Sequence, residues 1–141
     1  MRKPIRTDKA PPPAAAYEQA IMAGDLIFIS GQVANDPATG KIIEGSIEEQ
    51  VTRCLLNIEA ILKAGGADRR DIVRCGVFLV DLADFQAMNR AYIEFFAGNL
   101  PARTTVQAGL GTLRVEIDAI ALRSRKPASR RSAKNKLARR K

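Results

Sequence analysis

Few side chains in this sequence could bind a small anion or move a proton. They are one arginine, two acids and several neutral polar residues: Arg103, Glu116, Asp118, Tyr17, Ser30, Asn89 and Thr105. Histidine is absent from all 141 residues, which excludes Ser-His-Asp and Cys-His catalysis, His-ligated metals and RNA cleavage by histidine pairs. The two cysteines, Cys54 and Cys75, form no CxxC pair and are too few for a zinc cage. We expect both to be reduced core residues.

Arg103 and Glu116 each lie in a strand-like segment, where a charged side chain is costly to bury unless it has a partner or a function. Arg103 precedes the pattern at 104–108, and Glu116 lies inside the otherwise apolar run 113–122. If these segments form a hairpin that turns at Gly109, Arg103 faces Glu116 on one face of the sheet. The pair is then either a structural ion pair that fixes strand register, or a carboxylate clamp beside a glutamate that holds water or moves a proton. An arginine and a glutamate without further catalytic groups suit a reaction whose electrophile is already activated, such as hydrolysis of an imine.

The other polar candidates have both structural and functional interpretations. Tyr17 could be an interfacial ring that rests on the sheet, and Asn89 could be a polar residue on a helix surface. Gly31 follows Ser30 at a strand end, where glycine permits close approach to a ligand but also simply turns the chain. Spacing alone does not choose between these interpretations.

The elements that must position these residues follow from the hydrophobic periodicity. Short apolar segments predict strands at 18–22 and 26–30, joined by a tight turn, with a brief extended piece at 41–43. A stripe of helical spacing predicts a helix from 47 to 62, which begins with capping-box spacing at Ser46 and ends at a glycine pair.

The second half of the chain continues with a strand, a helix and two closing strands. The segment 71–81 has apolar residues at both odd and even positions, as in a strand that is buried on both faces. Asp81 can cap a helix whose apolar residues recur at spacings of three and four from 82 to 95. The segments 104–108 and 113–122 then predict the closing strands.

This order of elements predicts an α+β fold with both helices packed on one face of the sheet, as crossovers of the same hand. The opposite face is also expected to be apolar, because the sequence offers Leu26 to Ile29, Phe78, Val80, Ile120 and Leu122 for it. Two helices cannot cover both faces, so we expect another subunit to cover the second face and pockets to lie where subunits meet.

The chain divides into one domain and a basic tail. Residues 1–122 suit a single domain, preceded by a Pro-rich, extended lead-in at 1–16, and contain 13 basic against 15 acidic residues. The segment 123–141 has ten basic residues and no acid, and we expect it to be flexible because it lacks apolar residues. It is either a solubilising extension or a weak, salt-dependent contact for nucleic acid. No signal peptide or bilayer-spanning run is evident, so we expect a cytoplasmic protein without a membrane partner.

Several short motifs taken together carry a more specific signal. They are Tyr17, 29–32, 80–85, Asn89, 101–106 and 115–121. The set resembles the Rid (YjgF-type) family of reactive-intermediate deaminases, which includes relatives labelled L-PSP endoribonucleases and translation inhibitors. The resemblance covers nearly the whole body of the chain. It implies a chorismate-mutase-like fold with a mixed sheet, assembled as a homotrimer with three pockets at subunit interfaces and no metal or organic cofactor.

The resemblance also implies a role for each candidate residue. Arg103 would bind the carboxylate of an enamine or imine, and Glu116 would position the attacking water, which gives a 2-oxo acid and ammonium. The remaining candidates would line the pocket, with the backbone amide of Thr105 helping to hold the carboxylate: Tyr17, Ser30, Gly31, Asn89 and Thr105. The expected protein is a cofactor-independent hydrolytic deaminase of 2-aminoacrylate-like compounds.

Two alternatives stay open from the sequence. One is an RNA-binding or RNA-cleaving translation inhibitor that uses the basic tail. The other is a non-catalytic binder of small carboxylates, because Thr105 stands where the best-known deaminating members often have cysteine.

Overall fold

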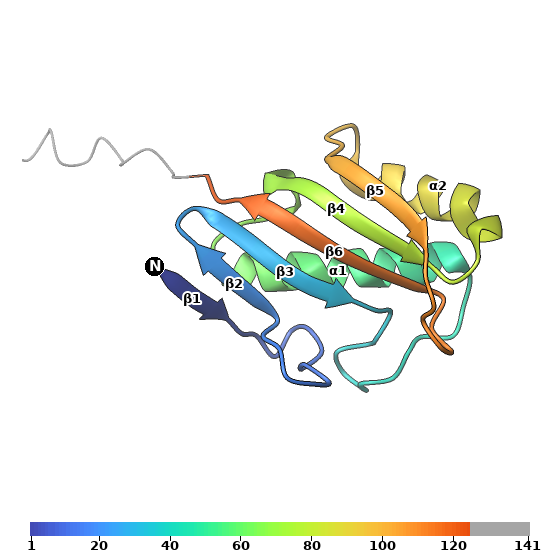
Figure 1. Ribbon diagram of the computed structural model, residues 1–141, viewed down its shortest axis with the longest axis horizontal. Helices are drawn as coiled ribbons and strands as arrows, with labels where there is room; N and C mark the ends of the chain where they lie inside the picture. Colours follow the sequence, from blue (N-terminus) through green and yellow to red (C-terminus); the bar gives the residue numbers. More distant parts are fainter. Residues whose placement is uncertain (125–141) are drawn as a thin grey trace, which may run out of the picture.

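The computed structural model describes residues 1–124, in which two helices cover one face of a six-stranded sheet (Figure 1). The strands are β1 (Arg2–Ile5), β2 (Ala20–Ala23), β3 (Leu26–Gln32), β4 (Ile72–Leu79), β5 (Ala102–Gln107) and β6 (Val115–Leu122). The helices are α1 (Ile47–Ala64) and α2 (Phe85–Phe96), with short 3-10 turns η1 (Arg69–Asp71) and η2 (Leu82–Asp84). The strand order is β1-β2-β3-β6-β4-β5, antiparallel throughout except for the parallel pair β4 and β5. The predicted α+β fold with a mixed sheet is confirmed.

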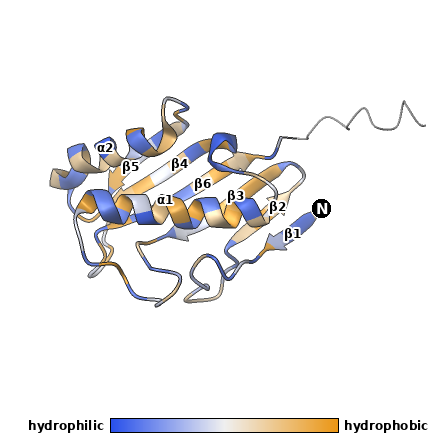
Figure 2. Ribbon diagram, turned by 180° about the vertical axis from the view of Figure 1, so that it is seen from behind, coloured by the Kyte–Doolittle hydropathy of each residue, from blue (hydrophilic) through white to orange (hydrophobic). Residues whose placement is uncertain are grey.

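Helix α1 forms where the capping and apolar patterns agree. The Ser46 side chain accepts a hydrogen bond from the Glu49 amide at 3.1 Å, which satisfies one of the free amides of the first turn. The helix ends at Gly65, and Gly66 has a φ of +80°, a conformation that favours glycine. Seen from the helix side, α1 lies over β3 and β6 (Figure 2). The predicted helix at 47–62 is therefore confirmed.

Helix α2 begins slightly later than the sequence predicts. The Asp81 side chain accepts a hydrogen bond from the Ala83 amide at 2.9 Å, but it caps the turn η2, and α2 starts only at Phe85. The helix ends where Ala97 and Gly98 take positive φ values of 48° and 89°. Asp81 thus still acts as a cap, but it caps a 3-10 turn, and the α-helix starts three residues later along the chain than predicted.

The core lies between the two helices and one face of the sheet. Its fully buried members come from α1, β4 and β6 above all and include Leu55, Ile58, Val77, Leu79 and Ile117. Cys54 and Cys75 are both free and buried, as predicted.

The other face of the sheet has no helix over it among residues 1–124. Its apolar side chains are substantially exposed, with Leu26 at 39%, Phe28 at 43%, Val106 at 42% and Leu122 at 50%. We call these four residues the open apolar face. The prediction that two helices leave this face uncovered is confirmed for the single chain.

Two sequence predictions about strands are wrong. Residues 2–5 of the supposed lead-in form strand β1, which pairs with β2 at the edge of the sheet, where Pro4 is tolerated. The segments β5 and β6 do not form a hairpin, because β4 lies between them and pairs with both. The α2 crossover returns β5 parallel to β4, on the side of β4 away from β6.

The remaining predictions of organisation are partly tested. The brief extended piece at 41–43 contributes only an isolated bridge between Asn35 and Ile42. Most of the predicted flexible tail lies outside the described residues. Ser124, near its start, donates a hydrogen bond to Asp71 at 2.7 Å. No helix within residues 1–124 is both long and apolar enough to cross a membrane.

Candidate active site

Arg103 lies on the helix-covered face of β5, at the edge of the sheet. It is the register partner of the buried Cys75 on β4, and paired residues point to the same face. Its guanidinium therefore points under α2. Nη1 donates a hydrogen bond to the Oδ1 atom of Asn89 at 2.8 Å and lies 3.9 Å from the Met88 sulfur.

Two aromatic rings of α2 complete the surroundings of Arg103. The guanidinium carbon lies 4.7 Å from the ring centroid of Tyr92 and 5.5 Å from that of Phe85. All four contacts recur at helical spacing and so form one stripe of α2: Phe85, Met88, Asn89 and Tyr92. The sequence contained this stripe, but its apolar members were interpreted as core alone.

One edge of the Arg103 guanidinium has no hydrogen-bond acceptor in the described part of the chain. Within residues 1–124, neither Nε nor Nη2 has a hydrogen-bond acceptor, whereas Nη1 is bound to Asn89. Arg103 is half-buried. A guanidinium edge with two parallel donors matches the two oxygens of a carboxylate, so this edge can bind one with good geometry.

Glu116 lies on the opposite face of the sheet. It is the register partner of Phe78 and shares the face of the exposed Val106 and Leu122. A β-carbon added at Gly31 would come within 2.8 Å of the Glu116 carboxyl carbon. The absence of a side chain at Gly31 therefore lets the Glu116 carboxylate lie close to the backbone. Gly31 lies where the pairing between β3 and β6 is irregular.

Ser30 and Tyr17 lie near Gly31 and are held by the segment that precedes β2. The Ser30 hydroxyl donates to the Glu18 carbonyl at 2.7 Å, and the Tyr17 hydroxyl accepts from the Ala14 amide at 3.2 Å. Tyr17 is 45% exposed. Tyr17 and Gly31 both line a cavity of about 60 Å³, walled on one side by prolines.

Thr105 shares the helix-covered face with Arg103 and is the register partner of Val77. Its hydroxyl oxygen is buried and has no hydrogen-bond partner within the described chain. Buried unpaired hydroxyls are costly. Because this oxygen is buried, the hydroxyl itself is not exposed to a ligand, and the predicted contact through the backbone amide stays a prediction.

The predicted site residues therefore form two groups within one chain. The arginine group, Arg103, Asn89 and Thr105, lies between β5 and α2. The glutamate group consists of Tyr17, Ser30, Gly31 and Glu116, near β3 and β6. The prediction that Arg103 faces Glu116 on one face is wrong, because it assumed a hairpin where β4 intervenes.

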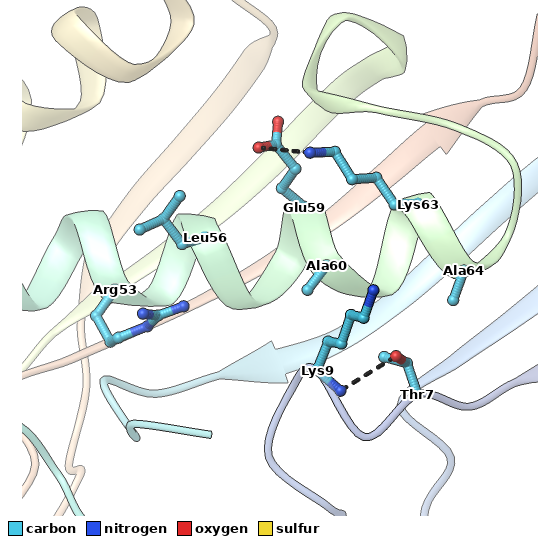
Figure 3. Close-up of a pocket in the computed structure, with 8 residues that line it drawn as sticks. All are labelled: Thr7, Lys9, Arg53, Leu56, Glu59, Ala60, Lys63 and Ala64. Atoms are coloured by element: carbon cyan, nitrogen blue, oxygen red, sulfur yellow. Dashed lines mark hydrogen bonds and ion pairs between the residues drawn. The ribbon is translucent and has the colours of Figure 1, made fainter. Parts of the chain in front are cut away.

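Two of the larger hollows within residues 1–124 contain none of the predicted site residues. One, of about 470 Å³, runs along the outer side of α1, where Lys9 lies against Ala60 and Lys63 turns toward Glu59 (Figure 3). The other, of about 510 Å³, lies between α1 and α2 and is lined by Leu56 and Ala91 among others. In the part of the chain described, no group of three or more acidic or cysteine side chains is placed to hold a metal ion.

The fold is that of a small α+β protein, in which the Nε–Nη2 edge of Arg103 has no acceptor among residues 1–124 and matches the shape of a carboxylate. Comparison with known proteins then gives the family: residues 7–123 match the family described as Endoribonuclease L-PSP, and the chain belongs to it. This confirms the resemblance found in the sequence motifs.

Individual relatives agree with this assignment. The rat 2-iminobutanoate/2-iminopropanoate deaminase is 41% identical over 125 residues, which cover 86% of this chain and 90% of that protein. A crystal structure described as a putative endoribonuclease from Thermotoga maritima has a TM-score of 0.84 and 38% identity, covering 89% and 100% of the two chains. The E. coli TdcF structure with bound serine has a TM-score of 0.81 and 36% identity, covering 86% and 99%. Other relatives are named only as RutC family proteins.

Proposed function

We propose that this protein is a cofactor-independent hydrolytic deaminase of reactive enamines and imines of the 2-aminoacrylate type. The observation that carries the proposal is the Nε–Nη2 edge of Arg103, which is half-buried, fixed by α2 and without a protein acceptor among residues 1–124. A small carboxylate fits this edge. Two similarities support the choice: the rat relative is named as an imine deaminase, and the TdcF structure holds serine, itself a small carboxylate.

The reaction needs only water and a proton. The enamine takes up a proton at its terminal carbon and becomes the iminium of a 2-imino acid. Water adds to carbon 2, a C–O bond forms, and the C–N bond then breaks with its electron pair leaving on nitrogen. One 2-imino acid in its iminium form and one water thus give one 2-oxo acid and one ammonium.

Two side chains divide this work. The Arg103 guanidinium binds the substrate carboxylate and orients carbon 2, while its positive charge offsets the negative charge beside the electrophile. The Glu116 carboxylate accepts a proton from the attacking water and passes a proton to the departing nitrogen. Glu116 is the only one of the two that needs to move a proton, since arginine stays charged.

The complete site requires two copies of the chain. We place the arginine group of one protomer against the glutamate group of its neighbour in a homotrimer. Three features support this arrangement: the two groups lie on opposite faces of one sheet, the open apolar face is exposed in the single chain, and β5 is an edge strand. Each interface then contains one site.

The proposal is tested with an assay in which a pyridoxal-phosphate enzyme releases 2-aminoacrylate in solution. We expect added protein to accelerate formation of the 2-oxo acid and Arg103→Ala to abolish the acceleration. Arg103→Lys should also fail, because an ammonium cannot present two parallel donors. The control is Arg70→Ala, which removes an exposed arginine that pairs with Asp68 far from the site groups. If the wild-type protein does not accelerate the reaction, the proposal is wrong.

The same preparation distinguishes the two alternatives. Truncation after Ser124 removes most of the basic residues of the tail and should leave deamination unchanged. RNA cleavage that survives purification and is lost in Arg103→Ala would replace our proposal with a nuclease. Binding of pyruvate measured by calorimetry, without any acceleration of imine hydrolysis, would instead identify a binding protein for small carboxylates.

A further inference from the structure

Arg69 shows how this fold holds an arginine against a carboxylate. Its Nε and Nη2 atoms donate to the two oxygens of Glu59, at 2.5 and 2.9 Å. Its Nη1 atom donates to the Phe95 carbonyl at 3.0 Å, and its guanidinium carbon lies 3.8 Å from the centroid of the Phe95 ring. Three contacts thus fix one guanidinium: a carboxylate on the Nε–Nη2 edge, a carbonyl oxygen on Nη1, and an aromatic ring beneath the guanidinium carbon.

Arg103 has two of these three contacts. Nη1 donates to the amide oxygen of Asn89 at 2.8 Å, and the guanidinium carbon lies over the Tyr92 ring, 4.7 Å from its centroid. The Nε–Nη2 edge, which in Arg69 binds Glu59, has no acceptor in the described chain. Arg6 binds Glu18 and Arg70 binds Asp68 through the same Nε–Nη2 edge.

We propose that Asn89 and Tyr92 are positioning residues that present the Nε–Nη2 edge of Arg103 to the substrate carboxylate. This inference rests on the proposed function for the identity of the ligand. It assigns Tyr92 a role that the sequence did not suggest, and it makes Asn89 act through Arg103. Because Nη1 is occupied by Asn89, the end-on geometry through Nη1 and Nη2 is disfavoured and the side-on geometry is selected.

The benefit of such positioning is entropic. A free arginine side chain loses rotamer freedom when it binds a ligand, and this loss of entropy weakens binding. Asn89 and the rings of Phe85 and Tyr92 on α2 immobilise Arg103 before the ligand binds. Tyr92 suits this role because it is only 2% exposed, and burial raises the pKa of its phenol so that the ring stays neutral.

The first experiment measures binding of pyruvate by calorimetry to three variants. We expect Tyr92→Phe to bind within about twofold of the wild type, since the ring remains, and Tyr92→Leu to bind about tenfold more weakly. The matched control is Phe95→Leu, which removes the ring under Arg69 on the same helix and should leave pyruvate affinity unchanged. Equal affinity of Tyr92→Leu and wild type would overturn the inference.

A second measurement does not depend on deaminase activity. In wild-type protein, the proton on Nε of Arg103 should show a ring-current shift in ¹H–¹⁵N spectra, and its signal is identified by its loss in Arg103→Lys. The shift should persist in Tyr92→Phe and disappear in Tyr92→Leu, or in Tyr92→Met if the leucine variant does not fold. An unshifted wild-type signal contradicts the inference.

The outcomes separate this inference from the proposed function. Absence of imine hydrolysis, together with Tyr92-dependent pyruvate binding, would reject the deaminase and keep the positioning role. Normal hydrolysis with a kcat/KM that is unchanged in Tyr92→Leu would keep the deaminase and reject the positioning role. The double variant Asn89→Leu/Tyr92→Leu should lose less than the product of the two single losses, because both act through Arg103.

Discussion

Arg103 and Glu116 lie on opposite faces of the sheet, on β5 and β6, with β4 between them. Side chains on opposite faces of one sheet cannot both contact a ligand of a few atoms. Each chain thus carries two separated parts of the proposed site, and chemistry that uses both residues depends on how copies of the chain associate. In the proposed function, deaminase activity therefore belongs to the interface between copies of the chain.

Subunit mixing tests this dependence directly. Arg103→Ala and Glu116→Ala should each be inactive alone. When the two are unfolded together, refolded in equal amounts and allowed to form random trimers, about one quarter of the interfaces pair an intact arginine with an intact glutamate. We therefore expect about one quarter of wild-type deaminase activity. Mixtures that stay inactive, although mass spectrometry shows mixed trimers, would mean that each site uses both residues of one chain.

The contact between Gly31 and Glu116 makes Gly31→Ala informative. The added methyl group would meet the Glu116 carboxyl group, and the flexible end of Glu116 must move away. Because a side-chain end can shift cheaply, we expect the free energy of unfolding to change by less than about 1 kcal/mol. Deaminase activity should nevertheless fall by at least about tenfold, because the carboxylate leaves its position beside the water.

The matched control for this substitution is Gly109→Ala, where an added β-carbon meets nothing within 4 Å. It should leave both stability and activity close to wild type. A Gly31→Ala variant with wild-type activity would show that the position of Glu116 is not critical.

The ion pair between Glu59 and Arg69 predicts a specific pH dependence of stability. The hydrogen bonds from Arg69 hold the pKa of the Glu59 carboxyl below its ordinary value of 4.5. A carboxyl with a lowered pKa stabilises the folded state above its unfolded pKa, and this stabilisation is lost as the pH falls through the folded pKa. We expect Glu59→Gln to reduce the free energy of unfolding at pH 7 by about 2 kcal/mol.

Urea titrations at several pH values check this prediction. The difference between wild type and Glu59→Gln should be constant from pH 7 to about pH 5 and should shrink below about pH 4.5. Glu94→Gln, which changes an exposed acid on α2, should show no such difference. A Glu59→Gln effect that is independent of pH would indicate lost packing rather than a lost ion pair.

The two cysteines should be unreactive in the folded protein. Burial raises the pKa of Cys75 to about 11 and also raises the pKa of Cys54. Since the thiolate is the reactive form, we expect modification by a disulfide reagent at pH 8 to be at least about tenfold slower in native than in denatured protein. A fast-reacting thiol in native protein would contradict the buried positions of both residues.

Most local structure could be predicted from the sequence because local patterns specify it. The capping residue Ser46 and the apolar stripe predicted helix α1. Apolar residues at both odd and even positions of β4 predicted a strand in the interior of the sheet. Strand β1 was missed because a four-residue edge strand with one buried side chain, Ile5, has too little pattern to detect. The contacts that α2 makes with Arg103 were missed because an aromatic residue such as Tyr92 can equally be a core residue or a surface on which a guanidinium packs.

The sequence by itself determined the two helices, the uncovered apolar face and the family, and it supplied the candidate site residues, since these depend on residue type and short-range spacing. Only the tertiary structure decided that β4 lies between β5 and β6 and that Arg103 points under α2 rather than toward Glu116. Strand order is a long-range property: the α2 crossover could place β5 on either side of β4, and packing across the whole sheet selects one.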